Sequence, residues 1–154
     1  MNFFMSYGGS ILAVLGAAVG FALAGIGSSK GVGTAGEAGA GVLTEEPGRF
    51  GAVMVLEALP STQAIYAFVI AFLTLQKVEL TMPLQNGLSL FVAALPVGIV
   101  GLISGIWQGK VATAGIHMVA KRPDGMGRGI VMALMVEMFA ILGFIISILM
   151  LGKV

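Results

Sequence analysis

Hydrophobic residues fill four long stretches of the chain, and short polar segments separate them. The stretches lie near residues 10–38, 51–76, 87–119 and 129–151. Each is long enough to cross a hydrocarbon core of roughly 30 Å as a helix of about 20 residues. The pattern therefore predicts an all-α membrane protein with four transmembrane helices.

The composition supports this prediction and narrows the function classes. Of the 154 residues, 58% are hydrophobic and 10% are charged, far from the balance of a soluble domain. The net charge is +1 and the longest basic run is Lys121-Arg122, so nothing indicates nucleic-acid binding. There is no cysteine, which leaves the redox compartment open.

The basic residues predict an orientation in the membrane. Six of the eight Lys and Arg residues flank the first and third connections: Lys30, Arg49, Lys110, Lys121, Arg122 and Arg128. The other two, Lys77 and Lys153, lie on the opposite side. The positive-inside rule therefore places the first and third connections in the cytoplasm. The termini and the connection at 75–87 are expected on the other face.

The second half of the chain repeats the first. FVIAFLTL (68–75) aligns with FIISILML (144–151) at a shift of 76. Each half is therefore predicted to be one helical hairpin with a polar turn. We expect the two hairpins to span residues 1–80 and 81–154.

The register of this repeat is not uniform in the sequence. GIGSSKG (25–31) aligns with GIWQGKV (105–111) at a shift of 80, whereas Pro47 aligns with Pro123 at a shift of 76. The change falls within the first helix or its turn, where the sequence leaves the register open.

Small residues mark one helix of each hairpin. They recur at a spacing of four in the first and third helices: Gly16, Gly20 and Ala24, then Gly101, Gly105 and Gly109. Such stripes let helix backbones approach closely inside a membrane. The second and fourth helices are bulkier, so each hairpin fits a wedge in a ring with its thin helix inside. A simple four-helix bundle is the alternative, because transporters use small-residue stripes as well.

One acidic residue interrupts the last hydrophobic stretch. Glu137 is the only charged residue between Arg128 and Lys153. A helical rise of about 1.5 Å per residue places it roughly 14 Å from Arg128, near the middle of the bilayer. An acid costs roughly 2.5 to 3.5 kcal/mol to insert there, so it is expected to be protonated, paired or bound to a cation, and to be functional. The alternative is a neutral acid that hydrogen-bonds two helices.

Other polar side chains are expected at the depth of Glu137. Thr62, Gln63 and Tyr66 fall within just over one turn of the second helix, and Gln108 lies in the third. Each of them could instead form an ordinary hydrogen bond between helices. Their common depth favours a joint site.

The backbone near Pro60 adds a further oxygen to this set. Proline lacks an N–H, so nearby carbonyls, that of Leu59 among them, can turn toward a ligand. An all-oxygen set suits hard cations, and His117, the only histidine, lies near the cytoplasmic end. With one carboxylate the charge balances for Na⁺ or H⁺, and the number of acceptors favours Na⁺. At a shift of 76, Glu137 aligns with Ser61, so the first hairpin has no corresponding acid.

Three segments carry a resemblance to a known family: LPSTQAIYAFVIAF (59–72), SGIWQGKVATAG (104–115) and MVEMFAILGFIIS (135–147). They resemble the proteolipid subunit (the rotor-ring c or K subunit) of V-type rotary ATPases. The resemblance is to the double-hairpin form, especially the K subunit of bacterial sodium-pumping members, and it covers essentially the whole chain. It implies a homo-oligomeric ring in a bacterial-type plasma membrane.

The resemblance implies a role for each residue of the oxygen set. Glu137 would be the carboxylate that carries the ion. The other Na⁺ ligands would be the backbone carbonyl of Leu59 and the side chains of Thr62, Gln63 and Gln108. Tyr66 would hydrogen-bond the carboxylate and hold it closed.

Two residues depart from the family pattern, Glu57 and Trp107. Glu57 is expected toward the cytoplasmic end, satisfied by water, a lipid headgroup or a neighbour. A second ion-linked carboxylate is the alternative. The sequence predicts no role for Trp107.

The resemblance also implies a rotary mechanism and its partners. The ring would turn past a stator protein whose buried arginine weakens cation binding at one Glu137 after another. ATP hydrolysis would occur on other subunits, since this chain has no Gly-rich phosphate loop and no catalytic set, and no organic cofactor is expected. The turns at 44–50 and 121–128 would contact the central stalk, and lipid would surround the ring.

Other function classes remain as alternatives. The same ring could carry H⁺ in place of Na⁺. A small four-helix secondary transporter with Glu137 as its proton-coupling acid would also fit a repeat with a midplane carboxylate. A structural pore-forming assembly is a further alternative, although it would not need the oxygen set.

Overall fold

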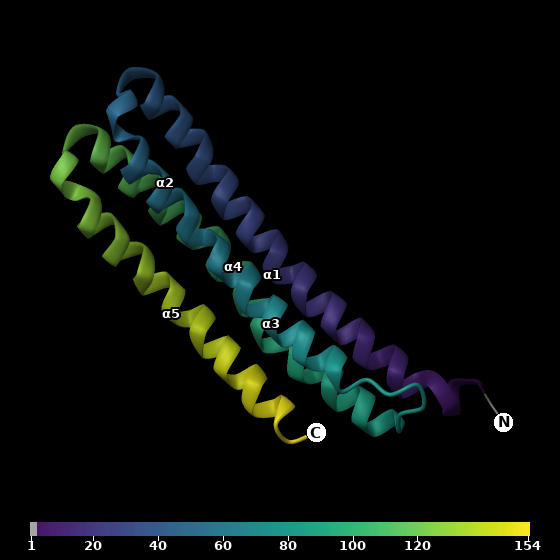
Figure 1. The fold of residues 1–154 in the computed structure, drawn as a ribbon. Helices are drawn as coiled ribbons and strands as arrows, with labels where there is room; N and C mark the ends of the chain where they lie inside the picture. The colour runs from purple at the N-terminus through teal and green to yellow at the C-terminus, as the bar shows by residue number, and fades with distance from the viewer. Residues whose placement is uncertain (1–2) are drawn as a thin grey trace.

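The computed structural model describes residues 3–154, which form long helices lying along one another (Figure 1). In chain order the elements are α1 (Phe3–Glu45), the 3₁₀ turn η1 (Pro47–Arg49), α2 (Phe50–Ala58), the 3₁₀ turn η2 (Leu59–Ser61), α3 (Thr62–Gln76), α4 (Leu84–Lys121), the 3₁₀ turn η3 (Pro123–Gly125) and α5 (Met126–Leu151). No β-strand occurs between residues 3 and 154. The two hairpin turns lie at one end of the molecule and both termini at the other (Figure 1).

Four helical segments are long and apolar enough to cross a membrane: Ser6–Glu45, Pro47–Gln76, Leu84–Lys121 and Pro123–Leu151. This confirms the predicted fold class. The helices are longer than the hydrophobic stretches, and α1 ends at Glu45 rather than near residue 38. Hydrophobicity marks only the part of a helix that lies in hydrocarbon, whereas the backbone hydrogen bonds continue beyond it.

The structure fixes the register of the internal repeat. α1 ends at Glu45 and η1 begins at Pro47, while α4 ends at Lys121 and η3 begins at Pro123. Both pairs differ by 76 positions. Since α1 and α4 run unbroken up to these turns, neither has room for a four-residue insertion. The shift of 76 therefore holds along the first helix, and the sequence match at 80 is displaced by one helical turn.

α1 and α4 pack against each other in parallel through their glycines. Three pairs, each 11 residues from the next, mark this seam: Gly9 with Gly87, Gly20 with Gly98 and Gly31 with Gly109. A Cβ added at Gly87, Gly98 or Gly109 would overlap the backbone of its partner. A repeat of 11 residues corresponds to about 3.67 residues per turn and favours a right-handed crossing. The predicted small-residue stripes thus hold the two hairpins together.

Two prolines interrupt the helical hydrogen bonding, and a serine from a neighbouring helix compensates near each of them. Pro60 lies in η2, and the backbone N–H of Ala64 donates to Ser28 Oγ of α1 at 3.0 Å. Pro96 lies inside α4, and the N–H of Val97 donates to Ser147 Oγ of α5 at 3.1 Å. These contacts tie the breaks to adjacent helices, because buried N–H groups need an acceptor.

Two clusters of buried apolar residues divide the core along the helix axes. One includes Ala24, Ala67 and Val97 and lies toward the termini. The other includes Ala35, Val53, Leu56, Ala112, Ile116 and Val119 and lies toward the hairpin turns. Between them is a polar layer formed by the buried side chains of Gln63, Gln108 and Glu137. The expected common depth of these three residues is therefore present in the fold.

Candidate functional site

Glu137 is a buried carboxylate, 6% exposed, on α5. Its Oε1 accepts a hydrogen bond of 2.5 Å from the Tyr66 hydroxyl, and its Oε2 accepts one of 3.2 Å from Gln108 Nε2. Among residues 3–154 the only ion pair joins Arg128 and Asp124, 3.9 Å apart at the surface. Glu137 thus has hydrogen-bond donors but no basic side chain of its own chain to balance a negative charge.

Gln63 and Gln108 form the second part of the polar layer. Gln63 Nε2 donates to Gln108 Oε1 at 2.5 Å, and Gln108 Nε2 also donates to the backbone carbonyl of Ala133 at 3.2 Å. Within the described chain, Gln63 Oε1 is buried and has no hydrogen-bond donor. A buried acceptor in that condition costs about 1 to 3 kcal/mol. A cation at this point would satisfy it.

The 3₁₀ turn η2 brings the carbonyl of Leu59 and the hydroxyl of Thr62 together, one turn before Gln63. Thr62 donates to the Leu59 carbonyl through its Oγ1, at 3.1 Å, and through its backbone N–H. The Leu59 carbonyl therefore already accepts two hydrogen bonds within this tight turn, and its role as a ligand stays a prediction. Thr62 directly precedes Gln63 in the sequence, and Leu59 lies four residues before it, so both oxygens lie within about one helical turn of the polar layer.

Aromatic stacking fixes the position of Tyr66. Its ring lies 5.2 Å from that of Phe144, with an angle of 29° between the ring planes. Phe144 belongs to α5, as does Glu137. The stacked pair therefore holds the Tyr66 hydroxyl toward the carboxylate.

The donor set restricts the chemistry of this layer. In the part of the chain that the structure describes, no three His, Cys, Asp or Glu residues come together as they do in many transition-metal sites. Amide, hydroxyl and carbonyl oxygens with one carboxylate fit a hard monovalent cation or a proton. Zinc and other metals that prefer nitrogen or sulfur do not fit.

Comparison with protein families matches the chain twice to the model that describes the C subunit of ATP synthase, at residues 15–74 and 91–150. The chain belongs to the ATP synthase C-subunit family. The two matches are displaced by the same 76 positions as the turns. They confirm the predicted duplication and the resemblance to rotary ATPase proteolipids.

Two curated relatives of this family cover most of the chain. The V-type sodium ATPase subunit K of Enterococcus hirae is 49% identical over 143 residues, which are 93% of this chain and 92% of the relative. The A-type ATP synthase subunit K of Methanocaldococcus jannaschii is 40% identical over 141 residues, 92% of this chain and 62% of the relative. Both are named as K subunits.

The two family repeats differ completely in the polar layer. At the shift of 76, Glu137 corresponds to Ser61, as predicted. The structure extends the difference to the two amides. Gln63 corresponds to Phe139 in the second repeat, and Gln108 corresponds to Val32 in the first. The polar layer therefore occurs once in the chain, at the seam between its own hairpins.

Two hydrogen bonds at or beside the polar layer were not predicted from the sequence. The carbonyl of Ala133 accepts from Gln108, and Ser28 accepts from Ala64 beside the Pro60 turn. A backbone carbonyl leaves no mark in a sequence. Ser28 could have been suspected from the sequence, because it is a polar residue within an apolar helix.

The two residues that depart from the family pattern lie outside the polar layer. Glu57 is half-buried on α2, with its carboxylate against Gly36 and Gly39 of α1. Trp107 is 55% exposed, although its neighbour Gln108 is fully buried. The Lys110 ammonium lies 4.1 Å from the centre of the Trp107 ring. His117 is exposed near the turn end of α4, away from the layer.

Proposed function

We propose that this protein forms the rotor ring of a membrane-embedded V-type ATPase and carries Na⁺ across the membrane on Glu137. Support comes from the family, from the relative named as a sodium ATPase subunit K, and from the polar layer around the carboxylate. The chain is a non-catalytic, ion-translocating subunit, and ATP is hydrolysed on other subunits. The second hairpin, 81–154, supplies the carboxylate, and the first, 1–80, contributes none.

One observation carries the choice of cargo. Glu137 is buried without a basic partner in the described chain, and beside it Gln63 Oε1 is buried without a donor. A bound Na⁺ would balance the charge of the first and satisfy the second. Its ligands would be the Leu59 carbonyl and the side chains of Thr62, Gln63, Gln108 and Glu137. Tyr66 would be the supporting hydrogen-bond donor.

Rotation would use the difference between a filled and an empty site. A carboxylate neutralised by its cation can pass the lipid, whereas an ionised one in hydrocarbon is strongly disfavoured. A buried arginine of the stator would displace the cation from each Glu137 in turn. Transport against a potential requires roughly 2.3 kcal/mol per charge for every 100 mV, supplied by ATP hydrolysis.

The remaining assignments concern partners and location. Identical subunits would form the ring, in a bacterial-type plasma membrane with lipid around it. The turns 44–50 and 121–128 would face the cytoplasm and contact the central stalk. Both turns lie at the same end of the molecule (Figure 1), so a single partner can reach them together.

A carbodiimide labelling experiment tests the cargo. The reagent should modify Glu137 in membranes, and added Na⁺ at neutral pH should slow the modification. Labelling that ignores Na⁺ but falls as pH rises would assign the ring to H⁺. A detergent-extracted protein that is only a monomer or dimer, without ATPase partners, would instead favour the secondary transporter.

A further inference from the structure

In the first repeat, one face of α1 packs against α4. The corresponding face of α4 in the second repeat lies on the side of α4 away from α1, which we call its free flank. Five α1 residues pack toward α4: Gly16, Gly20, Ala24, Gly27 and Gly31. At the shift of 76 their counterparts on α4 are Val92, Pro96, Val100, Ile103 and Trp107. All five counterparts are exposed or partly exposed. The second hairpin thus has an unused docking face that corresponds to the used face of the first.

The converse holds for the free flank of α1. The α4 residues that α1 covers are Ala94, Gly98, Gly101, Gly105 and Gly109. Their counterparts on α1 are Ala18, Ala22, Gly25, Ser29 and Gly33, again exposed or partly exposed. A Cβ added at Gly25 or Gly33 would meet nothing within 4 Å. This flank is lined by small residues with open space beside them.

The two free flanks fit a second copy of this chain. If a contact repeats the packing of one hairpin on the next, it joins unlike faces head to tail, and such a contact forms a ring where the rotation between copies closes. Inside the chain, a Cβ at Gly31 would meet Gly105, and a Cβ at Gly109 would meet Gly31. Moved by 76 positions, the same relationship sets Trp107 of one copy against Ser29 and Gly33 of the next.

We infer that Trp107 is the residue that locks neighbouring copies together, with its indole seated over Ser29 and Gly33 of the adjacent chain. The inference rests on the proposed ring. Trp107 lines an open groove between α4 and α5 together with Val136 and Phe139. Lys110 over the ring restricts its orientation.

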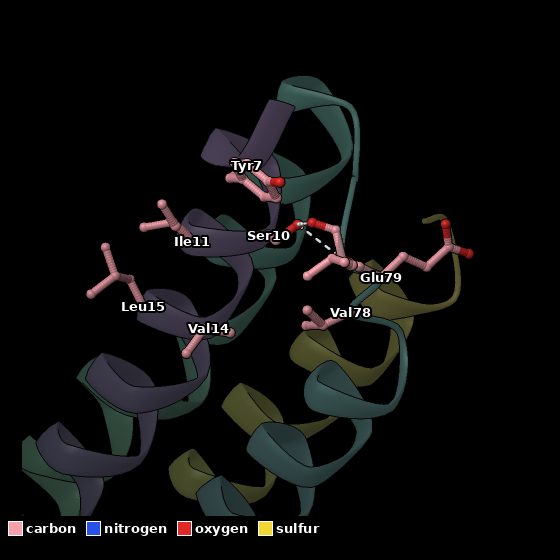
Figure 2. Close-up of a pocket in the computed structure, with 8 residues that line it drawn as sticks. Tyr7, Ser10, Ile11, Val14, Leu15, Val78 and Glu79 are labelled. Carbon is pink, nitrogen blue, oxygen red and sulfur yellow. Dashed lines mark hydrogen bonds between the residues drawn. The ribbon is translucent and has the colours of Figure 1, made fainter. Parts of the chain in front are cut away.

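Near the termini the seam between copies has larger residues on both sides. Figure 2 shows the α1 flank near the termini, where Ile11, Val14 and Leu15 project from the helix beside the chain segment at Val78 and Glu79. Inside the chain Gly16 lies against Phe91, and Gly9 lies against Gly87. Moved by 76 positions, these pairs set Val92 of one copy against Leu15 of the next, and Gln85 against Ile11. The seam inside the chain, by contrast, has glycine on at least one side of each of these contacts.

This seam between copies would bind no ion. The counterparts of Gln63 and Gln108 are Phe139 and Val32, which are apolar, and the counterpart of Glu137 is Ser61. Polar seams inside each chain therefore alternate with apolar seams between chains. The seam between chains is the wider of the two, because the indole of Trp107 separates its helix backbones. Trp107 then has a structural role in packing between copies and none in ion binding.

Cysteine cross-linking of the full chain in membranes tests the contact. The chain has no cysteine of its own, so the double variant Trp107→Cys/Gly33→Cys places two thiols at known positions. A short bifunctional thiol reagent should give a ladder of dimers and larger products. The matched control is Trp107→Cys/Gly41→Cys. Gly41 is equally open on α1 but lies about 12 Å farther along the helix, and several-fold less product is expected.

Fluorescence of the unaltered residue provides an independent measurement, since Trp107 is the only tryptophan. In reconstituted rings, lipids with brominated acyl chains should quench it weakly. They should quench strongly a tryptophan at Ile141 in the variant Ile141→Trp/Trp107→Phe, because Ile141 and its counterpart Ile65 are both exposed. Strong quenching of Trp107, or equal cross-linking of both cysteine pairs, in a protein that still forms rings overturns the contact alone. Absence of any ring in the unaltered protein overturns the proposed function together with the contact.

Discussion

The hydroxyl of Tyr66 lies 2.5 Å from Oε1 of Glu137 and joins α3 to α5 across the polar layer. The same carboxylate receives Gln108 Nε2 from α4 on its other oxygen. Both oxygens of the proposed ion carrier are therefore held by donors from two different helices. Such a carboxylate is oriented before any cation arrives, which favours binding because less freedom is lost.

Tyr66→Phe should weaken Na⁺ binding without disturbing the fold. The phenyl ring keeps the stacking on Phe144, and only the hydrogen bond to Glu137 is removed. A hydrogen bond to a charged group contributes about 1.5 to 3 kcal/mol, so affinity should fall roughly 10- to 100-fold. The Na⁺ concentration that half-protects Glu137 from carbodiimide measures this. Tyr7→Phe, near the start of α1, should leave it unchanged, and an unchanged value in Tyr66→Phe would contradict the holding role.

Glu137→Gln should abolish ion transport and the ATPase activity coupled to it while the ring still assembles. The amide keeps the size of the side chain but cannot bear the negative charge that binds and releases a cation. Transport into inverted vesicles and the size of the extracted ring are the measurements. Glu57→Gln is the matched control, because Glu57 lies against α1 outside the polar layer. Continued pumping by Glu137→Gln would remove the basis of the mechanism.

Gln63→Leu should separate Na⁺ binding from proton binding. Leucine is similar in size but removes both the donor to Gln108 and the unpartnered Oε1. Carbodiimide should still label Glu137, since the acid is intact, but Na⁺ should no longer protect it. Gln76→Leu, at the exposed end of α3, should retain full protection. If Gln63→Leu were protected as well as the unaltered protein, Gln63 would have only a packing role.

The sequence predicted the parts of the site that depend on helical geometry. Glu137 stands out because a charge in a long apolar run is costly, and a regular rise per residue places Gln63 and Gln108 at its depth. The sequence could not reveal that Ala133 accepts from Gln108, because every residue carries the same carbonyl. It also left the register of the repeat open in the first helix, since Gly-rich segments resemble one another at several registers. Contacts in three dimensions decide between them.

Ser28→Ala should destabilise the turn that precedes Gln63. Ser28 Oγ is the acceptor for the N–H of Ala64, and the side chain is 4% exposed. Leaving that N–H without an acceptor should cost about 1 to 3 kcal/mol. Thermal unfolding of the extracted protein should show a lower midpoint and weaker Na⁺ protection together. Ser89→Ala is the control, because the Ser89 hydroxyl bonds only within its own exposed helical turn, and equal effects of both changes would contradict the assignment.

Gly105→Ala should separate the two hairpins, although alanine is a better helix former than glycine. Propensity alone would favour the change by about 1 kcal/mol. The new Cβ, however, would lie 2.6 Å from the carbonyl carbon of Gly27 and 2.9 Å from the nitrogen of Ser28. These are backbone atoms that cannot move aside, and overpacking of this kind costs typically 1 to 3 kcal/mol or more. Gly41→Ala, in a helix interior with open space beside it, should be neutral or slightly stabilising. Gly105→Ala is therefore expected to lower the unfolding midpoint, whereas Gly41→Ala should leave it unchanged or raise it slightly. A stabilising Gly105→Ala would mean that α1 and α4 do not approach as closely as their glycines allow.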